Sequence, residues 1–263
     1  MQKKYGGTLI YKTRDEWGEI EVVEDAFHRS LHFGTEPKQS SMRLDDPDAL
    51  VISYTRAMMS ALLFQEQPRS ALLLGLGGGS LAKFLLHHFP ACRVDVVELR
   101  EAVCEVAREQ FQLRPDPRLN IHIGDAGEFM READPMRYGN YDLILIDAYD
   151  HKGMCASVDG LAFFDACRQR LAHGGVLSTN LWLDFENGVG RSLEAIKTSF
   201  DGNLLRLPVP GKGNIIGLAF DQPVTRRQLK QLTPRALELG RRYNLELPAL
   251  LHELRKHNRR FWF

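Results

Sequence analysis

Cysteine is scarce in this sequence. The 263 residues include only four, Cys92, Cys104, Cys155 and Cys167, and no two of them form a C-x-x-C pair. This argues against a disulfide framework and against cysteine-based zinc or redox motifs. We expect buried free thiols at the three cysteines that lie in apolar patterns, and no bound metal. The N-terminus lacks the pattern of a signal peptide, so a cytoplasmic location is expected.

An excess of charge of either sign is also missing. Lysine plus arginine and aspartate plus glutamate number 34 each. Without a net field to attract a polyanion, neither nucleic acid nor an anionic membrane is an expected partner. No apolar run is long enough to span a bilayer. The basic cluster at residues 255–260 is interpreted as a solvated chain end, with nucleic-acid contact as the alternative.

The chain does contain a glycine-rich motif between a strand pattern and a helix pattern. An apolar run at 71–74 is followed by Gly75, Gly77, Gly78 and Gly79. A second apolar run ends in Glu98, about 20 residues further on, where an acid can accept hydrogen bonds from ribose hydroxyls. The free N–H groups of the helix start favour a ligand there. The motif predicts a nucleoside site whose spacing fits S-adenosylmethionine better than NAD. A turn that only packs a helix on a strand is the alternative.

Strand and helix patterns divide the chain into three regions. Residues 1–65 carry short alternating patterns and then a helix pattern over 49–64, which predicts a small N-terminal antiparallel β unit with a connecting helix. Residues 66–222 alternate strands and helices, which predicts an α/β, Rossmann-like, doubly wound and mostly parallel sheet. Residues 223–263 are expected to form a C-terminal extension of two surface helices. In the central region we expect strands at 71–74, 94–98, 120–124, 141–147, 175–180, 204–208 and 214–220, and helices at 80–89, 102–111, 127–131, 161–169 and 188–200.

Acidic residues follow the ends of further predicted strands, where ligands bind in open α/β sheets. Asp125, before Ala126, could accept a hydrogen bond from a purine amino group, or it could cap the next helix. Asp147 ends the run Leu-Ile-Leu-Ile and is followed three residues later by Asp150. Two such acids can hold an incoming amine and accept its proton, although an ordinary turn cap is the alternative. Tyr149 lies between them and could stack on a ligand or hydrogen-bond to it.

Taken together, these segments resemble the polyamine aminopropyltransferases, the spermidine synthase family. The matching pieces are the glycine turn with Glu98, the stretch 123–126, the strand end at 141–150 with its D-x-x-D pattern, and the L-x-x-G-G-x-L segment at 171–177. The resemblance implies a homodimeric transferase that binds decarboxylated S-adenosylmethionine. In such enzymes an amine attacks the carbon next to the sulfonium, takes the aminopropyl group and releases methylthioadenosine.

The resemblance also implies a role for each matching residue. Asp147 would be the general base and Asp150 would bind the acceptor amine. Glu98 would hold the ribose, and Asp125 with Ala126 would hold the adenine. The remaining expected contacts are Gln39 near the nucleoside, and Tyr54 and Tyr149 near the acceptor.

Two of the departures from the family pattern bear on the choice of substrate. The family's glycine loop carries an Asp where this chain has Gly78, and that Asp helps to hold the aminopropyl amine. The family's Tyr-His-Glu element is Tyr54-Thr55-Arg56 here, which predicts a cation where an acid would attract a polyamine. Two other functions therefore stay open. One is an S-adenosylmethionine-dependent methyltransferase of small molecules, and the other is a noncatalytic dimeric binding module.

Overall fold

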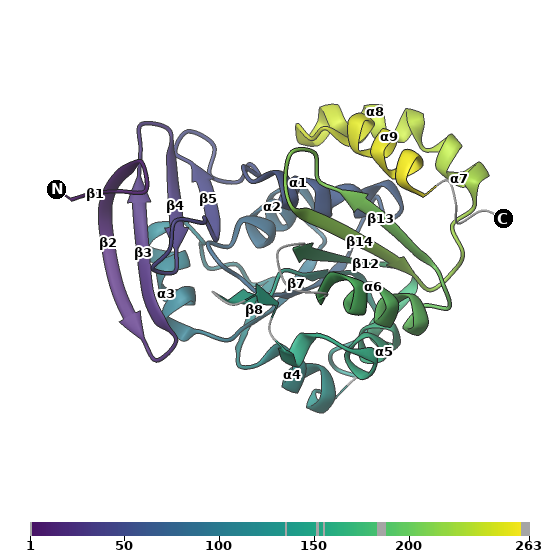
Figure 1. The fold of residues 1–263 in the computed structure, drawn as a ribbon, viewed down its shortest axis with the longest axis horizontal. Coiled ribbons are helices and arrows are strands. Elements are labelled where there is room, and N and C mark those ends of the chain that lie inside the picture. Colours follow the sequence, from purple (N-terminus) through teal and green to yellow (C-terminus); the bar gives the residue numbers. More distant parts are fainter. Residues whose placement is uncertain (1, 135, 151–152, 155, 183–187, 259–263) are drawn as a thin grey trace.

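Two large sheets, a two-stranded hairpin and a set of flanking helices make up the described part of the chain (Figure 1). The computed structural model describes residues 2–134, 136–150, 153–154, 156–182 and 188–258, with the backbone alone at 149, 150, 153, 154, 156 and 188. The N-terminal sheet contains β1 Lys3–Lys4, β2 Gly7–Asp15, β3 Gly18–Glu24, β4 His28–His32 and β5 Ser40–Arg43. The central sheet contains β6 Ser70–Leu74, β7 Arg93–Glu98, β8 Leu119–Ile123, β9 Tyr141–Ile146, β12 Leu171–Trp182, β13 Leu204–Pro208 and β14 Asn214–Phe220.

The helices lie between and after these strands. They are α1 Ser53–Met58, α2 Ser80–His88, α3 Glu101–Gln110, α4 Ala126–Glu132, α5 Leu161–Arg170, α6 Gly188–Ser199, α7 Arg226–Gln231, α8 Thr233–Tyr243 and α9 Leu247–His257. Two short 3-10 helices, η1 Met59–Leu63 and η2 Ala156–Val158, and a small hairpin of β10 Tyr149–Asp150 with β11 Gly153–Met154 complete the described elements.

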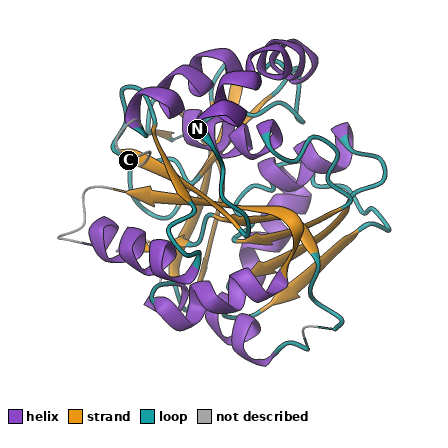
Figure 2. Ribbon diagram, turned by 90° about the vertical axis from the view of Figure 1, so that its right-hand side faces the viewer, coloured by secondary structure: helices purple, strands orange, loops and turns teal. Residues whose placement is uncertain are grey.

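The central sheet has the strand order β13-β14-β12-β9-β6-β7-β8. Strands β12, β9, β6, β7 and β8 run parallel to one another, whereas β14 is antiparallel to both β12 and β13. Helices cover both faces of this sheet (Figure 2). The predicted α/β, Rossmann-like and mostly parallel fold is therefore confirmed, together with the antiparallel N-terminal sheet.

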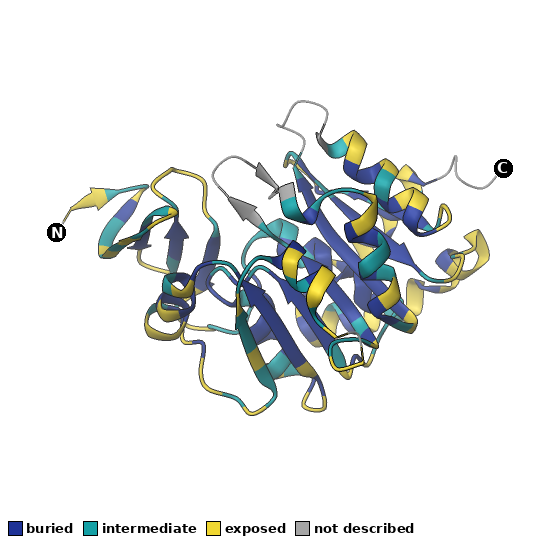
Figure 3. Cartoon of the chain, turned by 90° about the horizontal axis from the view of Figure 1, so that it is seen from below, coloured by how far each residue is buried: buried dark blue, intermediate teal, exposed yellow. Residues whose placement is uncertain are grey.

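Successive residues of a strand point to opposite faces, and β6 shows the consequence. Ala71 and Leu73 belong to one apolar core with α2, α8 and α9, whereas Leu72 and Leu74 belong to a second core with α4, α5 and α6. Because both faces are covered, the strands read as continuous apolar runs rather than alternating ones. Figure 3 shows these strands buried beneath helices whose outer sides are exposed.

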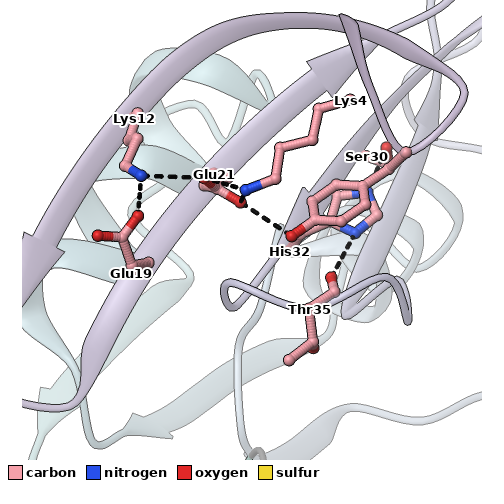
Figure 4. Close-up of polar contacts among 8 residues, drawn as sticks. Lys4, Lys12, Glu19, Glu21, Ser30, His32 and Thr35 are labelled. Atoms are coloured by element: carbon pink, nitrogen blue, oxygen red, sulfur yellow. Dashed lines mark hydrogen bonds and ion pairs between the residues drawn. The ribbon is translucent and has the colours of Figure 1, made fainter.

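The N-terminal sheet packs against α3, which brings it to the edge of the central sheet. Ile20, Val22 and Leu31 form an apolar cluster with Val103 and other residues of this helix. On β3, Glu21 is fully buried. Its carboxylate accepts hydrogen bonds from Lys4 Nζ (2.6 Å) and Tyr5 Oη (3.1 Å) and pairs with Lys12 (Figure 4). A buried carboxylate needs such partners, since the unpaired charge would be costly to desolvate.

Two regions differ from the sequence-based expectation. The predicted helix at 49–64 is shorter, because α1 begins at Ser53 and gives way to the 3-10 helix η1 at Met59. The C-terminal region forms three helices instead of two, and they are not confined to the surface. Their apolar residues, among them Leu247 and Leu251, join the core of the central sheet. Among the described helices, none combines the length and the apolar character needed to cross a bilayer.

Candidate active site

The carboxyl ends of the parallel strands open onto one large cavity. Its volume is about 890 Å³. The central sheet contributes the residues that follow β6, β7, β8 and β9, and the N-terminal sheet closes the opposite side. A cavity of this size is within the range that holds a small organic ligand. Among the residues that line the cavity are Gln39, Ser40, Tyr54, Gly75, Gly77, Glu98, Asp125, Ala126, Asp147, Asn180, Lys212 and Asn214.

The glycine turn wraps around the carboxylate of Glu98. The N–H of Leu76 donates to Glu98 Oε2 (2.9 Å), and the N–H of Arg100 donates to Oε1 (3.0 Å). Burial raises the pKa of Glu98, and these backbone donors act against that rise. Gly75 has φ +100°, and a Cβ there would lie 2.4 Å from the carbonyl oxygen of Asp147. Only glycine therefore lets the turn pass this close to the end of β9.

The four glycines of the motif have different surroundings. Gly75 and Gly77 line the cavity, whereas Gly78 and Gly79 are not among the lining residues. A Cβ at Gly78 would lie 2.7 Å from Ser40 Oγ and 3.0 Å from Phe111 Cδ1. The present packing thus leaves no room for an acidic side chain at Gly78, the position where the family pattern has Asp.

Asp125 acts as the N-cap of α4. Its Oδ1 accepts from the N–H of Glu128 (2.8 Å), and its Oδ2 accepts from Ser157 Oγ (2.6 Å). The capping alternative raised from the sequence is therefore confirmed. Asp125 and Ala126 also line the cavity, so capping does not remove them from the site.

Asp147 is a half-buried carboxylate that lines the cavity at the end of β9. Its Oδ2 accepts from Tyr54 Oη (3.0 Å) and its Oδ1 accepts from Asn180 Nδ2 (3.0 Å). Burial raises the pKa of Asp147, and the two donors oppose that rise. A carboxylate with a raised pKa that faces a cavity has the properties of a general base. Tyr54 is thus placed beside Asp147 although 93 positions separate them in the sequence.

Gln39 and Ser40 line the cavity from the N-terminal sheet, where Ser40 Oγ lies 3.1 Å from Ser80 Oγ at the start of α2. Ser41 also lines the cavity, and its buried hydroxyl has no hydrogen-bond partner within the described ranges. The predicted contacts of the Tyr149 and Asp150 side chains lie outside the described residues; their backbone forms strand β10.

Sequence reasoning missed the polar residues of β12 and β14. Asn180 and Asn214 both line the cavity, and Asn214 Nδ2 donates to Asn180 Oδ1 (2.9 Å). Lys212, in the turn between β13 and β14, lines it as well. Asn180 lies near the carboxyl end of a predicted strand, which is the one signal that could have indicated it.

Arg56 does not line the cavity, although the sequence predicted a cation near the acceptor there. Its guanidinium pairs with Glu246 and donates to the carbonyl oxygens of Leu50 and Asn244. Arg56 is not a cavity residue, so its charge is directed to the C-terminal helices instead of to an acceptor. The described part of the chain contains no group of three or more His, Cys, Asp or Glu side chains arranged to hold a metal ion.

Comparison with known proteins identifies the family. A family model described as "Spermine/spermidine synthase domain" matches residues 51–184. The polyamine aminopropyltransferase of Chromobacterium violaceum is 36% identical over 245 residues, which cover 91% of this chain and 90% of that protein.

Solved structures show the same fold. A probable spermidine synthase from Corynebacterium glutamicum superposes with a TM-score of 0.73 at 22% identity, covering 86% of both chains. Human methyltransferase-like protein 13, in complex with SAH, superposes with a TM-score of 0.63 at 25% identity, covering 73% of this chain and 93% of that one. The expected resemblance is confirmed, and this chain belongs to the spermine/spermidine synthase family of transferases.

Proposed function

We propose that the enzyme transfers the aminopropyl group of decarboxylated S-adenosylmethionine to a small-molecule amine. The curated relative is a polyamine aminopropyltransferase and covers nearly the whole chain. The observation that carries the chemistry is the Asp147 carboxylate, held by Tyr54 and Asn180 at the wall of a nucleoside-sized cavity.

The nucleoside would lie across the ends of β6, β7 and β8. Glu98 would accept hydrogen bonds from the ribose hydroxyls with lone pairs that the backbone donors leave open. Asp125 and Ala126 would contact the adenine, and Gln39 would contact the nucleoside from the N-terminal sheet. This arrangement is supported by the position of each residue on the cavity wall.

In the reaction, the nitrogen lone pair of the acceptor amine attacks the aminopropyl carbon that is bonded to the sulfonium. A carbon–nitrogen bond forms, and the carbon–sulfur pair returns to sulfur, which leaves as the neutral thioether of methylthioadenosine. Asp147 accepts the proton that the amine loses. Asp150 would bind the second amine of the acceptor, and Tyr149 and Tyr54 would flank it. Holding both reactants in line supplies much of the rate enhancement.

The assay is the release of methylthioadenosine from decarboxylated S-adenosylmethionine in the presence of diamines. We expect release that depends on the diamine and that is lost in Asp147→Asn. If the purified enzyme binds neither methylthioadenosine nor decarboxylated S-adenosylmethionine in a calorimetric titration, the proposal is wrong. If Asp147→Asn leaves transfer unchanged, Asp147 is not the base.

A methyltransferase is the second candidate function. Two observations favour it: the packing around Gly78 has no room for the acid that the family pattern carries there, and the fold resembles methyltransferase-like protein 13 in complex with SAH. The same assay decides between them. A methyltransferase would use S-adenosylmethionine and release S-adenosylhomocysteine, whereas the leading proposal requires preference for the decarboxylated form.

We further propose a cytoplasmic homodimer with the three regions 1–65, 66–222 and 223–263. The cytoplasm is supported by the free, buried thiols of Cys92, Cys104 and Cys167, which suit a reducing compartment. The dimer is supported by the exposed apolar residues Ile10 and Phe27 on the N-terminal unit. Light scattering of the purified protein would test it, and a monomeric mass would reject it.

A further inference from the structure

A chain of two amides leads from β14 to the Asp147 carboxylate. Asn214 Nδ2 donates to Asn180 Oδ1 (2.9 Å), and Asn180 Nδ2 donates to Asp147 Oδ1 (3.0 Å). Asn180 is 2% exposed and Asn214 is 8% exposed. Strands β12 and β14 pair with Trp182 opposite Asn214 and Asn180 opposite Ile216. The two asparagines are therefore diagonal neighbours on one face of the sheet, within reach of each other.

The direction of this chain matters because an asparagine side chain has a donor end and an acceptor end. With its Oδ1 bound to Asn214, Asn180 can only present its Nδ2 to Asp147. A reversed amide would place Oδ1 of Asn180 against Oδ1 of Asp147, so that two acceptors would face each other at the buried Asn180 side chain. Such a buried mismatch is costly. The carboxylate, which can only accept, therefore requires Asn180 in this orientation, and Asn214 holds Asn180 there by donating to its Oδ1.

We propose that Asn180 and Asn214 form an amide relay that positions Asp147 and keeps it ionised for proton acceptance. Both are positioning residues, and Asn214 acts through Asn180. The proposal rests on the proposed aminopropyl transfer for its kinetic consequences, although not for its effect on the carboxylate itself.

The relay supplies a donor where the surroundings offer few. Burial raises the pKa of Asp147, which favours its protonated form, and its other described donor is Tyr54 from α1. The other titratable side chains that line this cavity are Glu98 on β7, Asp125 before α4, Arg100 before α3 and Lys212 on the β13–β14 turn, with Glu19, His28 and Lys38 from the N-terminal unit. The side chain of Asp150 on β10 lies outside the described residues. Removing a donor from Asp147 should therefore raise its pKa.

A double-mutant cycle tests the relay. We would compare Asn180→Ala, Asn214→Ala and the double variant by the pH profile of kcat/KM for aminopropyl transfer. Each single variant should move the acidic limb upward by about one pH unit. The double variant should move it no further than Asn180→Ala alone, because Asn214 has no other route to Asp147. Additive shifts would mean that Asn214 acts separately, and unchanged limbs would remove both residues from the mechanism.

Asn120→Ala is the matched control. Asn120 Nδ2 donates to Asp95 Oδ1 (2.9 Å), the same kind of bond in the same sheet, and neither residue lines the cavity. The acidic limb should stay in place in this variant. Unchanged affinity for methylthioadenosine in calorimetric titration would show that the relay variants keep a folded nucleoside site. If Asn180→Ala does not fold, Asn180→Ser takes its place in the cycle.

A second measurement separates this inference from the proposed function. The pKa of Asp147 can be followed by ¹³C NMR of carboxyl-labelled aspartate, with Asp147→Asn to assign its signal. The signal should titrate at higher pH in both single variants, whether or not the protein transfers an aminopropyl group. If transfer is absent but these shifts occur, the proposed function is wrong and the relay stands. If transfer occurs without the shifts, the relay is wrong.

Discussion

The hydroxyl of Tyr54, on α1, donates a 3.0 Å hydrogen bond to Oδ2 of Asp147 at the end of β9. Helix α1 lies outside the strand–helix repeats of the central sheet, yet it supplies one of the two described donors to this carboxylate. The α1 segment therefore belongs to the candidate active site as much as the sheet does.

Tyr54→Phe should lower kcat/KM by about tenfold or more, because a hydrogen bond to a charged group at the cavity wall is lost. Methylthioadenosine affinity should be unchanged. Steady-state kinetics and calorimetric titration measure the two effects. Tyr141→Phe is the matched control, since Tyr141 Oη donates to Asp95 Oδ2 (2.9 Å) away from the cavity. Equal kinetic losses in both variants would contradict a specific role for Tyr54.

Glu98→Gln should weaken nucleoside binding by about 10- to 100-fold and lower the free energy of unfolding by about 1–3 kcal/mol. Both carboxylate oxygens accept backbone N–H bonds, so the new amide group would place a donor against the N–H of Leu76 or Arg100. Calorimetric titration with methylthioadenosine and urea unfolding measure these changes. Glu21→Gln, at a buried carboxylate of the N-terminal sheet, should reduce stability without reducing affinity. Normal nucleoside binding by Glu98→Gln would contradict the ribose assignment.

Asp147→Asn should abolish transfer and flatten part of the pH dependence of stability. Burial raises the folded-state pKa of Asp147, so the native state binds protons that the unfolded state has released. The stability from this group is complete below the unfolded pKa of about 3.9 and is lost as pH rises through the folded pKa.

Urea unfolding from about pH 4 to about pH 9 gives the comparison. The variant should become more stable relative to the wild type as the pH rises through that window. Glu98, whose pKa is also raised by burial, contributes the same trend to both proteins and cancels in the difference. Parallel curves for the two proteins would show that Asp147 titrates alike in the folded and unfolded states.

The parallel strands could be predicted from the sequence because both faces of the sheet are covered. The parallel strands β6 and β7 differ from the predicted ranges only at their first residue, and the antiparallel strands β13 and β14 also begin and end at the predicted residues. The acids at the ends of the parallel strands could be predicted together with the strands, because these strand ends share one edge of the sheet. Asp125 and Asp147 could thus be placed at one cavity before the structure was known.

Contacts between distant segments could not be predicted in the same way. Asn214 and Asn180 meet because β14 runs antiparallel beside β12, and nothing in the local pattern of β14 indicates that pairing. The position of Arg56 near the acceptor was predicted from the adjacent residues of its motif, whereas its partner Glu246 lies 190 positions away in the sequence. A charged side chain on a short helix can face a cavity or the opposite side, and only the packing of α8 and α9 decides which.

Arg100→Ala should lower the free energy of unfolding by about 2 kcal/mol and weaken nucleoside binding. The Arg100 guanidinium donates to both carboxylate oxygens of Asp15 (2.9 and 2.8 Å) and to the carbonyl oxygen of Gly18, so it ties the β2–β3 turn to the cavity wall. Urea unfolding and calorimetric titration test this. Arg43→Ala, which breaks an exposed pair with Asp45, should cost about 0.5 kcal/mol or less. Similar losses of stability in both variants would mean that burial does not strengthen the ion pair between Arg100 and Asp15.

Arg56 and Lys212 should differ in their effect on the acceptor, because Lys212 lines the cavity and Arg56, the cation expected there from the sequence, does not. Arg56→Ala should reduce stability and leave the KM for a diamine unchanged, because its guanidinium pairs with Glu246 and holds the carbonyl oxygen of Asn244. Lys212→Ala should lower the KM for a diamine by up to about fivefold, since this cation lines the cavity and repels a second one through solvent. Kinetics with a diamine and with a monoamine separate the effects, because the monoamine lacks the distal charge. A lower diamine KM in Arg56→Ala, with no change in Lys212→Ala, would return Arg56 to the acceptor site and show that helix α1 presents its charge to the cavity.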